Sequence, residues 1–573
     1  MTQPTHKKEN LIIDMQPIGR RVDVAPGTTL LAAAQASGVG LVSLCGGEGW
    51  CESCLVRITN GEVNDPTRSE LDYLGESDLA AGFRLACQVI PRSDVRIDIP
   101  AESLSTPQRL QIEGRDFEIA LDPNLEVVDL EIAPPSISDL RADAERLLMA
   151  LRDEGHHDVC VQLPVLASIS GLLRENKWNV RVVVREKEVI AILPPGSGIF
   201  GISVDIGTTK LALYLVDLLT GEVIEKVGEM NPQIAYGEDV VSRIAYATQN
   251  EGGRETLQGT LSNTLNKLLA QVCRSSGVST WQVVDAVIVG NTAMHHLFAG
   301  LPVEQLVFAP YVPAINEPVD IRASAIGIDL APGAYIHLLP NIAGYVGADH
   351  SAVILSTELW KTDQTVMVID VGTNTEISLV SNGNLTSCSC ASGPAFEGAH
   401  ITNGMRAAPG AIERVQIIDG EIKTFTIEDQ LPVGICGSGI LDVVAEMKAA
   451  NLMDERGALI EGQMNIRRGN KDRLEFLLVP REFSGNNRDI TVSRTDVNEI
   501  QLAKAAIKAG QEILLDKAGI DPEDIDEIII AGAFGTSIDV PKAISVGMIP
   551  DIPVERFRQL GNAAGMGATQ ALI

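Results

Sequence analysis

The chain is poor in aromatic residues, in basic residues and in long apolar runs, and each shortage excludes a class of function. Aromatic residues make up only 4% of the 573 residues, which argues against a platform that stacks nucleic-acid bases. There are 45 basic against 76 acidic residues and a net charge of −31, so the surface repels nucleic acid and anionic membranes. No apolar run is long enough to predict a membrane span.

Cysteine is scarce outside one region, and no disulfide framework is visible. Four of the nine cysteines share one pattern, described below. The other five form no pairing set: Cys160, Cys273, Cys388, Cys390 and Cys436. The amino-terminal residues Lys7 and Lys8 are not followed by an apolar segment, so no secretion signal is predicted. These features together predict a cytoplasmic protein with reduced thiols.

The four patterned cysteines, Cys45, Cys51, Cys54 and Cys87, have the spacing C-x5-C-x2-C, followed by a fourth cysteine after 32 residues. Three thiolates on one tight loop and one distant thiolate form the ligand set of a [2Fe–2S] ferredoxin. The loop between the first two cysteines is rich in glycine, which lets backbone N–H groups point at sulfur. The alternatives are a zinc site, which usually pairs two short cysteine knuckles, and buried structural thiols.

The length corresponds to about four domains of ~150 residues, and composition suggests where they divide. Residues 1–99 are predicted to form a ferredoxin-type domain of the β-grasp class around the cluster loop. Residues 100–108 read as a linker because they are rich in Pro and Ser. Residues 109–197 read as a small α/β middle domain, and residues 198–573 carry the second set of motifs.

Apolar periodicity predicts the main elements of the first two domains. In the ferredoxin domain, helices are predicted over residues 30–37 and 69–79, and a strand over 95–99 is expected to close the sheet. In the middle domain, a strand is predicted over 117–121 and a helix over 139–153. The helix would place Leu140, Ala144, Leu147, Leu148 and Leu151 on one face.

The carboxy-terminal part contains an internal repeat of a strand, an Asp-x-Gly-Thr turn and a second strand, over residues 201–217 and 366–380. Each turn offers backbone N–H groups and hydroxyls to phosphates, and each brings a carboxylate that can hold Mg²⁺ or its waters. The candidate residues are Asp205, Gly207, Thr208, Thr209 and Lys210 in the first copy and Asp370, Gly372, Thr373 and Asn374 in the second. Two copies are much stronger evidence than one.

A third glycine-containing turn supports the same site. An apolar strand over residues 528–531 opens into Gly532, Ala533 and Gly535, where the backbone can approach a nucleotide closely. Gly437 and Ser438 either line the same cleft or permit close packing of a helix. The phosphate-binding motif G-x4-G-K-[ST] is absent from the sequence, so a Walker ATPase is excluded.

The two hairpins and the later glycine turn resemble the ATPase core shared by acetate and sugar kinases, Hsp70 and actin. This resemblance implies a two-lobed domain with duplicated ribonuclease H-like folds, in which the hairpins clamp the phosphates of ATP and the glycine turn lies beside adenosine. Asp205 and Asp370 would orient Mg²⁺ and its waters, and Lys210 would either face the phosphates or solvent. Asp239 and Glu376 are candidates for positioning the attacking water.

The whole chain, over residues 10–573, resembles the reductive activators of corrinoid enzymes. That resemblance rests on the order of domains and on stretches such as 231–244, 370–376 and 531–535. It implies that ATP drives the reduction of a Co(II) corrinoid to Co(I) with electrons from the cluster. The corrinoid is expected on a partner protein, because the pattern D-x-H-x2-G is absent here. A low-potential electron donor is also implied, and homodimer formation is left open.

Two other functions remain open at this point. One is ATP-driven electron donation to another low-potential enzyme, such as a 2-hydroxyacyl-CoA dehydratase, although those activators usually share a cluster between subunits. The other is a non-catalytic, redox-responsive protein in which ATP only sets the affinity for a partner. Neither needs a nucleic acid or a membrane.

Overall fold

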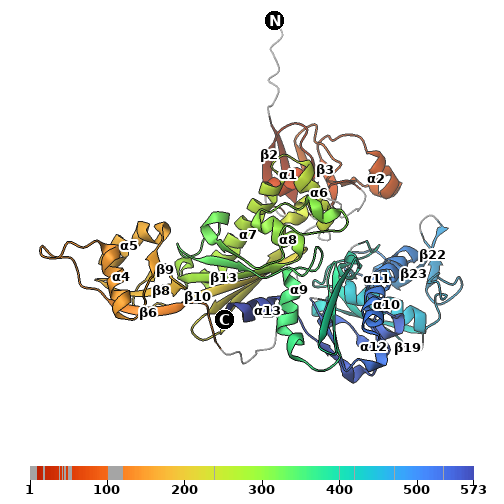
Figure 1. Ribbon diagram of the computed structural model, residues 1–573. Coiled ribbons are helices and arrows are strands. Elements are labelled where there is room, and N and C mark those ends of the chain that lie inside the picture. Colours follow the sequence, from red (N-terminus) through yellow and green to blue (C-terminus); the bar gives the residue numbers. More distant parts are fainter. Residues whose placement is uncertain are drawn as a thin grey trace, which may run out of the picture.

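The computed structural model (Figure 1) describes residues 10–573 apart from some short stretches. The residues that it does not describe are 1–9, 17–19, 38, 40, 42, 44–46, 50–53, 101–102, 104–120, 238, 399, 419, 470–471 and 533. Cys45, Cys51 and Ala533 therefore lie outside the described residues. So do most of the predicted linker and residues 117–120 of the strand predicted over 117–121.

The ferredoxin-type domain is one five-stranded sheet with the order β2-β1-β5-β3-β4, covered by short helices. The strands are β1 (Leu11–Gln16), β2 (Arg20–Val24), β3 (Leu55–Asn60), β4 (Phe83–Leu85) and β5 (Val95–Asp98). The last strand, β5, lies in the middle of the sheet, parallel to β1, and not at its edge. The Thr29 side chain caps helix α1 (Leu30–Ala36) by accepting from the N–H of Ala32 at 3.2 Å.

The single helix predicted over 69–79 is wrong, because two short helices stand there. Helix α2 (Arg68–Tyr73) ends at Leu74, whose backbone is extended (φ −86°, ψ 140°), and α3 (Glu76–Ala80) begins after Gly75. Thr67 and Glu70 form a capping box at the start of α2. Glu70, in the first turn of α2, is buried in the domain.

Glu70 and Arg84 form a buried ion pair that ties α2 to β4. The carboxylate oxygens of Glu70 accept from Arg84 Nε at 2.7 Å and Nη2 at 2.8 Å, and also from the N–H groups of Thr67 and Leu85. Burial raises the pKa of Glu70, but these bonds outweigh it and the pKa of the carboxyl is lowered. The charged pair therefore supports the strand that leads to Cys87.

Glu70→Gln is expected to destabilise the ferredoxin domain by about 3 kcal/mol, because it leaves a buried guanidinium without its charge partner. Since the folded pKa of Glu70 is depressed, its stabilisation is present above the unfolded value of about 4.3 and is lost as pH falls below it. Thermal loss of the cluster's visible absorbance, which reports on this domain alone, measures the change. The matched variant Asp72→Asn alters an exposed carboxylate of the same helix and should leave the transition unmoved; equal transitions for both variants would contradict the account.

The middle domain is a four-stranded sheet with the order β6-β8-β9-β7 and two helices. Its elements are β6 (Glu126–Glu131), α4 (Asp143–Asp153), β7 (Cys160–Val161), α5 (Leu163–Glu175), β8 (Asn179–Arg185) and β9 (Glu188–Leu193). The helix predicted from residue 139 is wrong at its start. Asp139 instead pairs with Arg141 at 2.6 Å and with Arg146 at 2.8 Å, which holds residues 136–139 in a turn. Leu140 is consequently 85% exposed.

Polar contacts fix the middle domain to residues 320–335, which belong to the first of the two lobes described below. Arg185 pairs with Asp320 at 2.9 Å, and Glu188 accepts from Arg322 at 2.7 Å and from the Tyr335 hydroxyl at 2.8 Å. Side chains of β8 and β9 also belong to the apolar core of the first lobe. The middle domain projects to one side in Figure 1, but its base shares packing with the lobe beside it.

The rest of the chain consists of two lobes built on the same plan, as the internal repeat predicts. Each main sheet has an antiparallel hairpin with a third strand on one side and two parallel strands on the other, and the first sheet has one more, antiparallel strand at that edge. The first sheet, β12-β11-β10-β13-β15-β14, consists of β10 (Phe200–Ile206), β11 (Lys210–Asp217), β12 (Val223–Met230), β13 (Val283–Gly290), β14 (Val319–Arg322) and β15 (Tyr335–Leu338). The second, β18-β17-β16-β25-β26, consists of β16 (Val366–Val371), β17 (Thr375–Ser381), β18 (Asn384–Cys390), β25 (Glu527–Ala531) and β26 (Phe557–Gln559).

Helices and two small sheets complete the lobes. The first lobe has α6 (Val240–Gln249), α7 (Gly253–Ser276), α8 (Thr292–Ala299) and α9 (Ala348–Ser356), and the second has α10 (Gly437–Ala449), α11 (Arg494–Ala518) and α12 (Val540–Val546). The small sheets of the second lobe are β19 (Ala411–Ile418), β20 (Glu421–Thr426) and β21 (Gly434–Ile435), and β22 (Ile466–Arg468), β23 (Leu474–Val479) and β24 (Ile490–Ser493).

The carboxy-terminal helix α13 (Ala563–Leu572) leaves the second lobe and returns to the first. Figure 1 shows this blue helix next to α9 and the yellow strands of the first sheet. Thr569 exchanges a hydrogen bond with Ser203 of β10 at 2.7 Å, and the apolar side of α13 joins the first lobe's core. The two lobes are therefore linked twice, through α9 and through α13.

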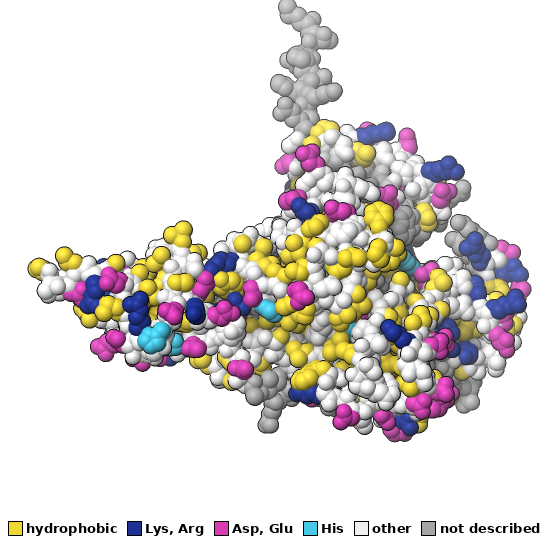
Figure 2. Space-filling model, viewed as in Figure 1, with side chains coloured by type: hydrophobic (Ala, Val, Ile, Leu, Met, Phe, Trp, Pro, Cys, Tyr) yellow, Lys and Arg dark blue, Asp and Glu magenta, His cyan; other side chains and the backbone are white. Residues whose placement is uncertain are grey.

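The surface agrees with the charge of the chain. On the face in Figure 2, acidic side chains are scattered over all parts, and basic side chains lie among them without forming a broad basic patch. No helix over the described residues is long and apolar enough to cross a membrane.

Candidate functional site

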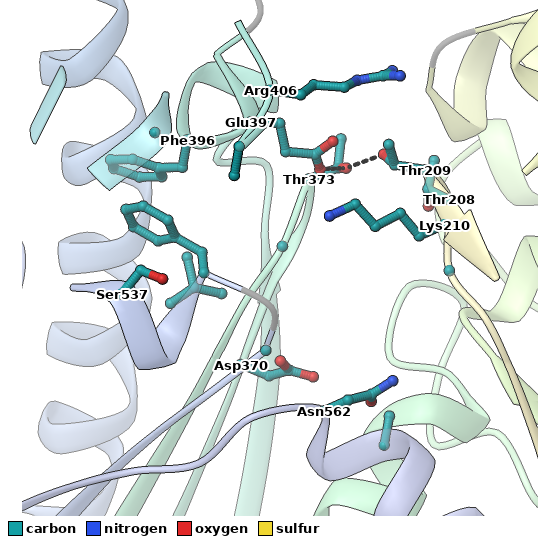
Figure 3. Close-up of a pocket in the computed structure, with 18 of the residues that line it drawn as sticks. Thr208, Thr209, Lys210, Asp370, Thr373, Phe396, Glu397, Arg406, Ser537 and Asn562 are labelled. Carbon is teal, nitrogen blue, oxygen red and sulfur yellow. Dashed lines mark hydrogen bonds between the residues drawn. The ribbon is translucent and has the colours of Figure 1, made fainter. Parts of the chain in front are cut away.

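The two Asp-x-Gly-Thr turns meet across a cavity between the lobes. The cavity is lined by Asp205, Gly207, Thr208, Thr209 and Lys210 from the first turn and by Asp370, Gly372, Thr373, Asn374 and Glu376 from the second. The hydroxyl oxygens of Thr209 and Thr373 lie 3.3 Å apart, so the turns touch directly (Figure 3). The repeat thus forms a clamp with equivalent groups on both sides.

Buried polar side chains hold the first turn in place. Arg243 of α6 donates to the carbonyl oxygens of Thr208 and Gly237, and Asn231 donates to the Gly207 carbonyl at 2.8 Å. Asn291, at the start of α8, donates to the Thr208 hydroxyl at 2.9 Å. These bonds hold the backbone of the turn in place at the edge of the cavity, which Gly207, Thr208 and Thr209 line.

Four acidic side chains gather at the floor of the cavity: Asp205, Asp349, Asp370 and Glu376. Burial raises the pKa of Asp205 to about 6, although Asn562 donates to it at 2.9 Å. Burial and the neighbouring Asp205 raise the pKa of Asp370 to about 7. The pKa values of Asp349 and Glu376 are raised by burial and by the other acids. A bound cation would lower these pKa values and favour the ionised carboxylates.

Asp349 is not part of either repeated turn, yet helix α9 places it among them. The next residue, His350, is fully buried, and its Nε2 lies 2.6 Å from the hydroxyl of Ser378 in β17. Ser378 in turn lies 2.7 Å from Ser387 of β18. One step along the same face of β17, Glu376 accepts from Ser389 at 3.0 Å. This row of polar contacts fixes the start of α9 against the second lobe and so fixes Asp349.

The opposite end of the cavity is apolar. The rings of Phe396 and Phe534 stack with centroids 4.9 Å apart and planes at 20°, and both line the cavity beside Ser537. Gly532 brings the backbone of β25 close to Asp370: its φ is +92°, and a Cβ there would lie 2.7 Å from an Asp370 oxygen. An apolar pocket beside a polar clamp suits a nucleoside phosphate.

Lys210 and Arg406 are positively charged residues of the cavity lining. Figure 3 shows the Lys210 amine directed into the cavity, on the side where Thr373 donates to the Glu397 carboxylate. Burial lowers the pKa of Lys210, while Glu397 acts in the opposite direction. Lys210 therefore points inward and not to solvent, which resolves the alternative left open by the sequence.

Not every predicted residue reaches the cavity. Gly437, Ser438 and Gly532 line it, but Gly535 does not. Asp239 lies at the start of α6, where its carboxylate accepts from the N–H of Ser242 at 2.7 Å as a helix cap. Asp239 is therefore not among the residues that line the cavity, whereas Asp349 is.

Several lining residues were missed by the sequence reasoning, among them Asp349, Asn562, Phe396, Glu397, Phe534 and Arg406. None of them belongs to a repeated motif. Asn291 also lines the cavity, and its place at the junction between β13 and α8 is a signal that could have identified it.

Two of the four predicted cluster ligands can be placed. Cys54 and Cys87 are both buried, and the pairing of β3 with β4, with the Ala86 N–H donating to the Cys54 carbonyl at 2.9 Å, brings them to the same end of the sheet. Gly47, in the loop between the first two predicted ligands, lies against Cys87. Its φ is +102°, and a Cβ added to it would lie 3.9 Å from the Cys87 Cβ. A glycine loop folded over buried thiols fits an iron–sulfur cluster.

Comparisons with known proteins agree with this arrangement over the whole chain. A 2Fe–2S iron–sulfur cluster binding domain matches residues 13–92, and the RACo linker region, the RACo middle region and the C-terminal domain of RACo, called the ASKHA domain, match residues 114–197, 200–362 and 364–573. A solved structure titled reductive activator for corrinoid, iron–sulfur protein is 35% identical, with a TM-score of 0.70, over 98% of this chain and 92% of that one. The chain belongs to the RACo family.

Relatives of known activity extend the RACo comparison. The corrinoid activation enzyme RamQ of Eubacterium limosum is 30% identical over 96% of this chain and 91% of its own length. The [Co(II) methylated amine-specific corrinoid protein] reductase of Methanosarcina barkeri is 27% identical over 64% of this chain and 68% of its own. The acid-lined cavity lies where the RACo middle region and the RACo ASKHA domain meet.

Proposed function

We propose that this protein is an ATP-dependent reductive activator that reduces the Co(II) corrinoid of a partner protein to Co(I), with electrons that pass through its [2Fe–2S] cluster. The observation that carries the proposal is the presence, in one chain, of buried cluster cysteines and of an acid-lined, two-turn cavity. Its RACo relatives are named as a corrinoid activation enzyme and a corrinoid protein reductase. Enzymatic coupling of ATP hydrolysis to electron transfer uses both sites.

In the cavity, the phosphates of ATP would lie between the turns at Gly207 and Gly372. Among the described residues, no three His, Cys, Asp or Glu side chains are grouped tightly enough to hold a metal alone. Mg²⁺ suits such a site, because it commonly keeps several waters and uses one or two carboxylates together with substrate phosphates. Asp205 and Asp370 would supply those carboxylates, and the ion would neutralise charge that develops on the phosphates.

Asp349 and Glu376 are the groups best placed to orient the attacking water. Asp349 lies among the other three acids without belonging to a turn, and Glu376 is held by Ser389. A carboxylate held by a rigid element can position a water and accept its proton. Phe396 and Phe534 would pack against the nucleobase, which leaves the triphosphate over the clamp.

The electron transfer is the step that needs the energy of ATP. A plant-type [2Fe–2S] centre lies near −400 mV, and reduction of a protein-bound Co(II) corrinoid requires a still lower potential. Each ~59 mV of that gap costs a factor of ten in the equilibrium for one electron. A nucleotide-dependent change that favours one redox state of the partner can offset it. A separate low-potential protein would reduce the cluster.

The proposal is tested by offering the reduced, cluster-loaded protein two kinds of acceptor. A Co(II) corrinoid protein should yield Co(I) absorbance with MgATP and far less with MgADP, whereas a 2-hydroxyacyl-CoA dehydratase should gain no activity. Activation of the dehydratase alone would favour the first alternative function. Electron delivery to neither acceptor would favour a redox-responsive binding protein.

A further inference from the structure

The side chain of Gln88 connects the sulfur of Cys87 to the cluster loop. Its Nε2 donates to the Gly47 carbonyl oxygen at 3.2 Å and to Cys87 Sγ at 3.6 Å. A primary amide carries two N–H groups, so this geometry uses both. One holds the loop backbone, and the other points at a sulfur predicted to ligate iron.

Asn64 anchors the backbone at Gln88, while the loop at Gly47 and Gly49 holds the amide itself. The backbone carbonyl of Gln88 accepts from Asn64 Nδ2 at 3.0 Å, and the Ile90 N–H donates to Asn64 Oδ1 at 2.7 Å. On the other side, Gly49 has a φ of +85°, and a Cβ there would lie 2.7 Å from Gln88 Nε2. A larger residue at 49 would displace the amide, so the loop contributes the space that the amide needs.

We propose that Gln88 sets the reduction potential of the cluster by donating a hydrogen bond to the Cys87 sulfur. Reduction adds one negative charge to the cluster and its thiolates. A donor aimed at a ligating sulfur stabilises the reduced form more than the oxidised form, because the reduced form carries more charge. Groups that hydrogen-bond to metal ligands tune a centre in this way without touching the metal. The amide therefore raises the potential.

In the proposed function, on which this consequence rests, the hydrogen bond sets how the total energy required is shared between reducing the cluster and reducing cobalt. A higher cluster potential makes the cluster easier to reduce by its donor. It also makes the transfer from cluster to cobalt steeper, which increases the part that ATP must drive. Gln88 would thus affect electron transfer through the Cys87 sulfur, without contacting the iron.

The test is a potentiometric titration of the full-length, cluster-loaded protein without ATP or partner, followed by visible absorbance. Gln88→Met removes the donor and keeps the length of the side chain, and Gln88→Glu replaces the donor with a carboxylate of nearly the same shape. At the wild-type midpoint, the ratio of reduced to oxidised cluster should fall about tenfold in Gln88→Met, which corresponds to a midpoint ~59 mV lower. The midpoint of Gln88→Glu should be lower still, because the carboxylate adds a negative charge beside the cluster.

The matched control is Asn64→Ala, which loosens the same segment without contacting the sulfur. It should keep the wild-type midpoint even if the cluster is lost faster on heating. Wild-type midpoints in both Gln88 variants would overturn the proposal. Loss of iron from both would also overturn it, since the amide would then serve only to hold the loop through Gly47. Because neither ATP nor a corrinoid is present, the outcome is independent of the proposed function.

Discussion

Replacing Asp370 by asparagine is expected to slow Mg²⁺-dependent ATP hydrolysis by about 10²–10³-fold, which corresponds to ~3–4 kcal/mol of lost charge stabilisation. Asp370 ends β16, faces the cavity (Figure 3) and lies close to Asp205 and to the turn at Gly532. Asparagine keeps the size of the side chain but removes the charge that a metal ion needs. Phosphate release in steady state measures the effect.

Two comparisons make the Asp370 result specific. Asp363→Asn changes an exposed acid just before the same strand and should leave hydrolysis unchanged. The cluster spectrum of Asp370→Asn should also be that of the wild type, because the cysteines belong to another domain. Normal hydrolysis by Asp370→Asn would show that the two turns do not form the clamp described above.

Cys54→Ala is expected to abolish the [2Fe–2S] cluster and with it all formation of Co(I), while ATP hydrolysis continues. Cys54 is 1% exposed just before β3, which pairs with the strand that leads to Cys87, so alanine here removes a buried thiol of the predicted ligand set. Iron analysis of anaerobically purified protein should fall from two irons per chain to none.

The cysteine control is Cys160→Ala, because Cys160 is exposed in the middle domain and outside the cluster pattern. It should keep both irons and the wild-type rate of Co(I) formation. Zinc in place of iron in the wild-type protein would contradict the cluster assignment. Loss of ATP hydrolysis in Cys54→Ala would show that the two sites are not structurally separate.

The parts of the fold that could be predicted from the sequence are those with a local pattern. Both hairpins follow from an apolar strand that ends in Asp-x-Gly-Thr, and in each the aspartate pairs with the returning strand, Asp205 with Ala212 and Asp370 with Glu376. The helix cap at Thr29 is local too, because its side chain accepts from the N–H of Ala32, three residues on. These features depend only on residues a few positions apart.

The residues that could not be predicted reach the site through long-range packing. Asn562 donates to Asp205 across 357 positions of the chain, because α13 returns to the first lobe. Asp349 lies beside the other three acids because α9 is held against β17 by the contact of His350 with Ser378. Asp239, an acid near a motif, caps α6 and is not among the residues that line the cavity. An aspartate in sequence does not reveal which of these positions it will occupy.

Helix boundaries failed where side-chain ion pairs compete with helical periodicity. The apolar spacing over 139–153 is real, but Asp139 pairs with Arg141 and Arg146 and holds a turn in place of the first helical turn. Near Glu70, the buried pair with Arg84 accompanies a break after one and a half turns. The Glu70–Arg84 pair joins two separate elements, so its formation depends on the tertiary structure.

The coupling of the two sites is tested most directly by the steady amount of Co(I) that forms. The protein and a Co(II) corrinoid partner are held at a fixed solution potential too high for appreciable unassisted reduction, and the Co(I) absorbance is read with MgATP and with MgADP. Coupled electron transfer predicts a clearly larger Co(I) fraction with MgATP, and no such gain for Asp370→Asn or Cys54→Ala. Equal Co(I) fractions with the two nucleotides would contradict it, because ATP would then not drive the reduction.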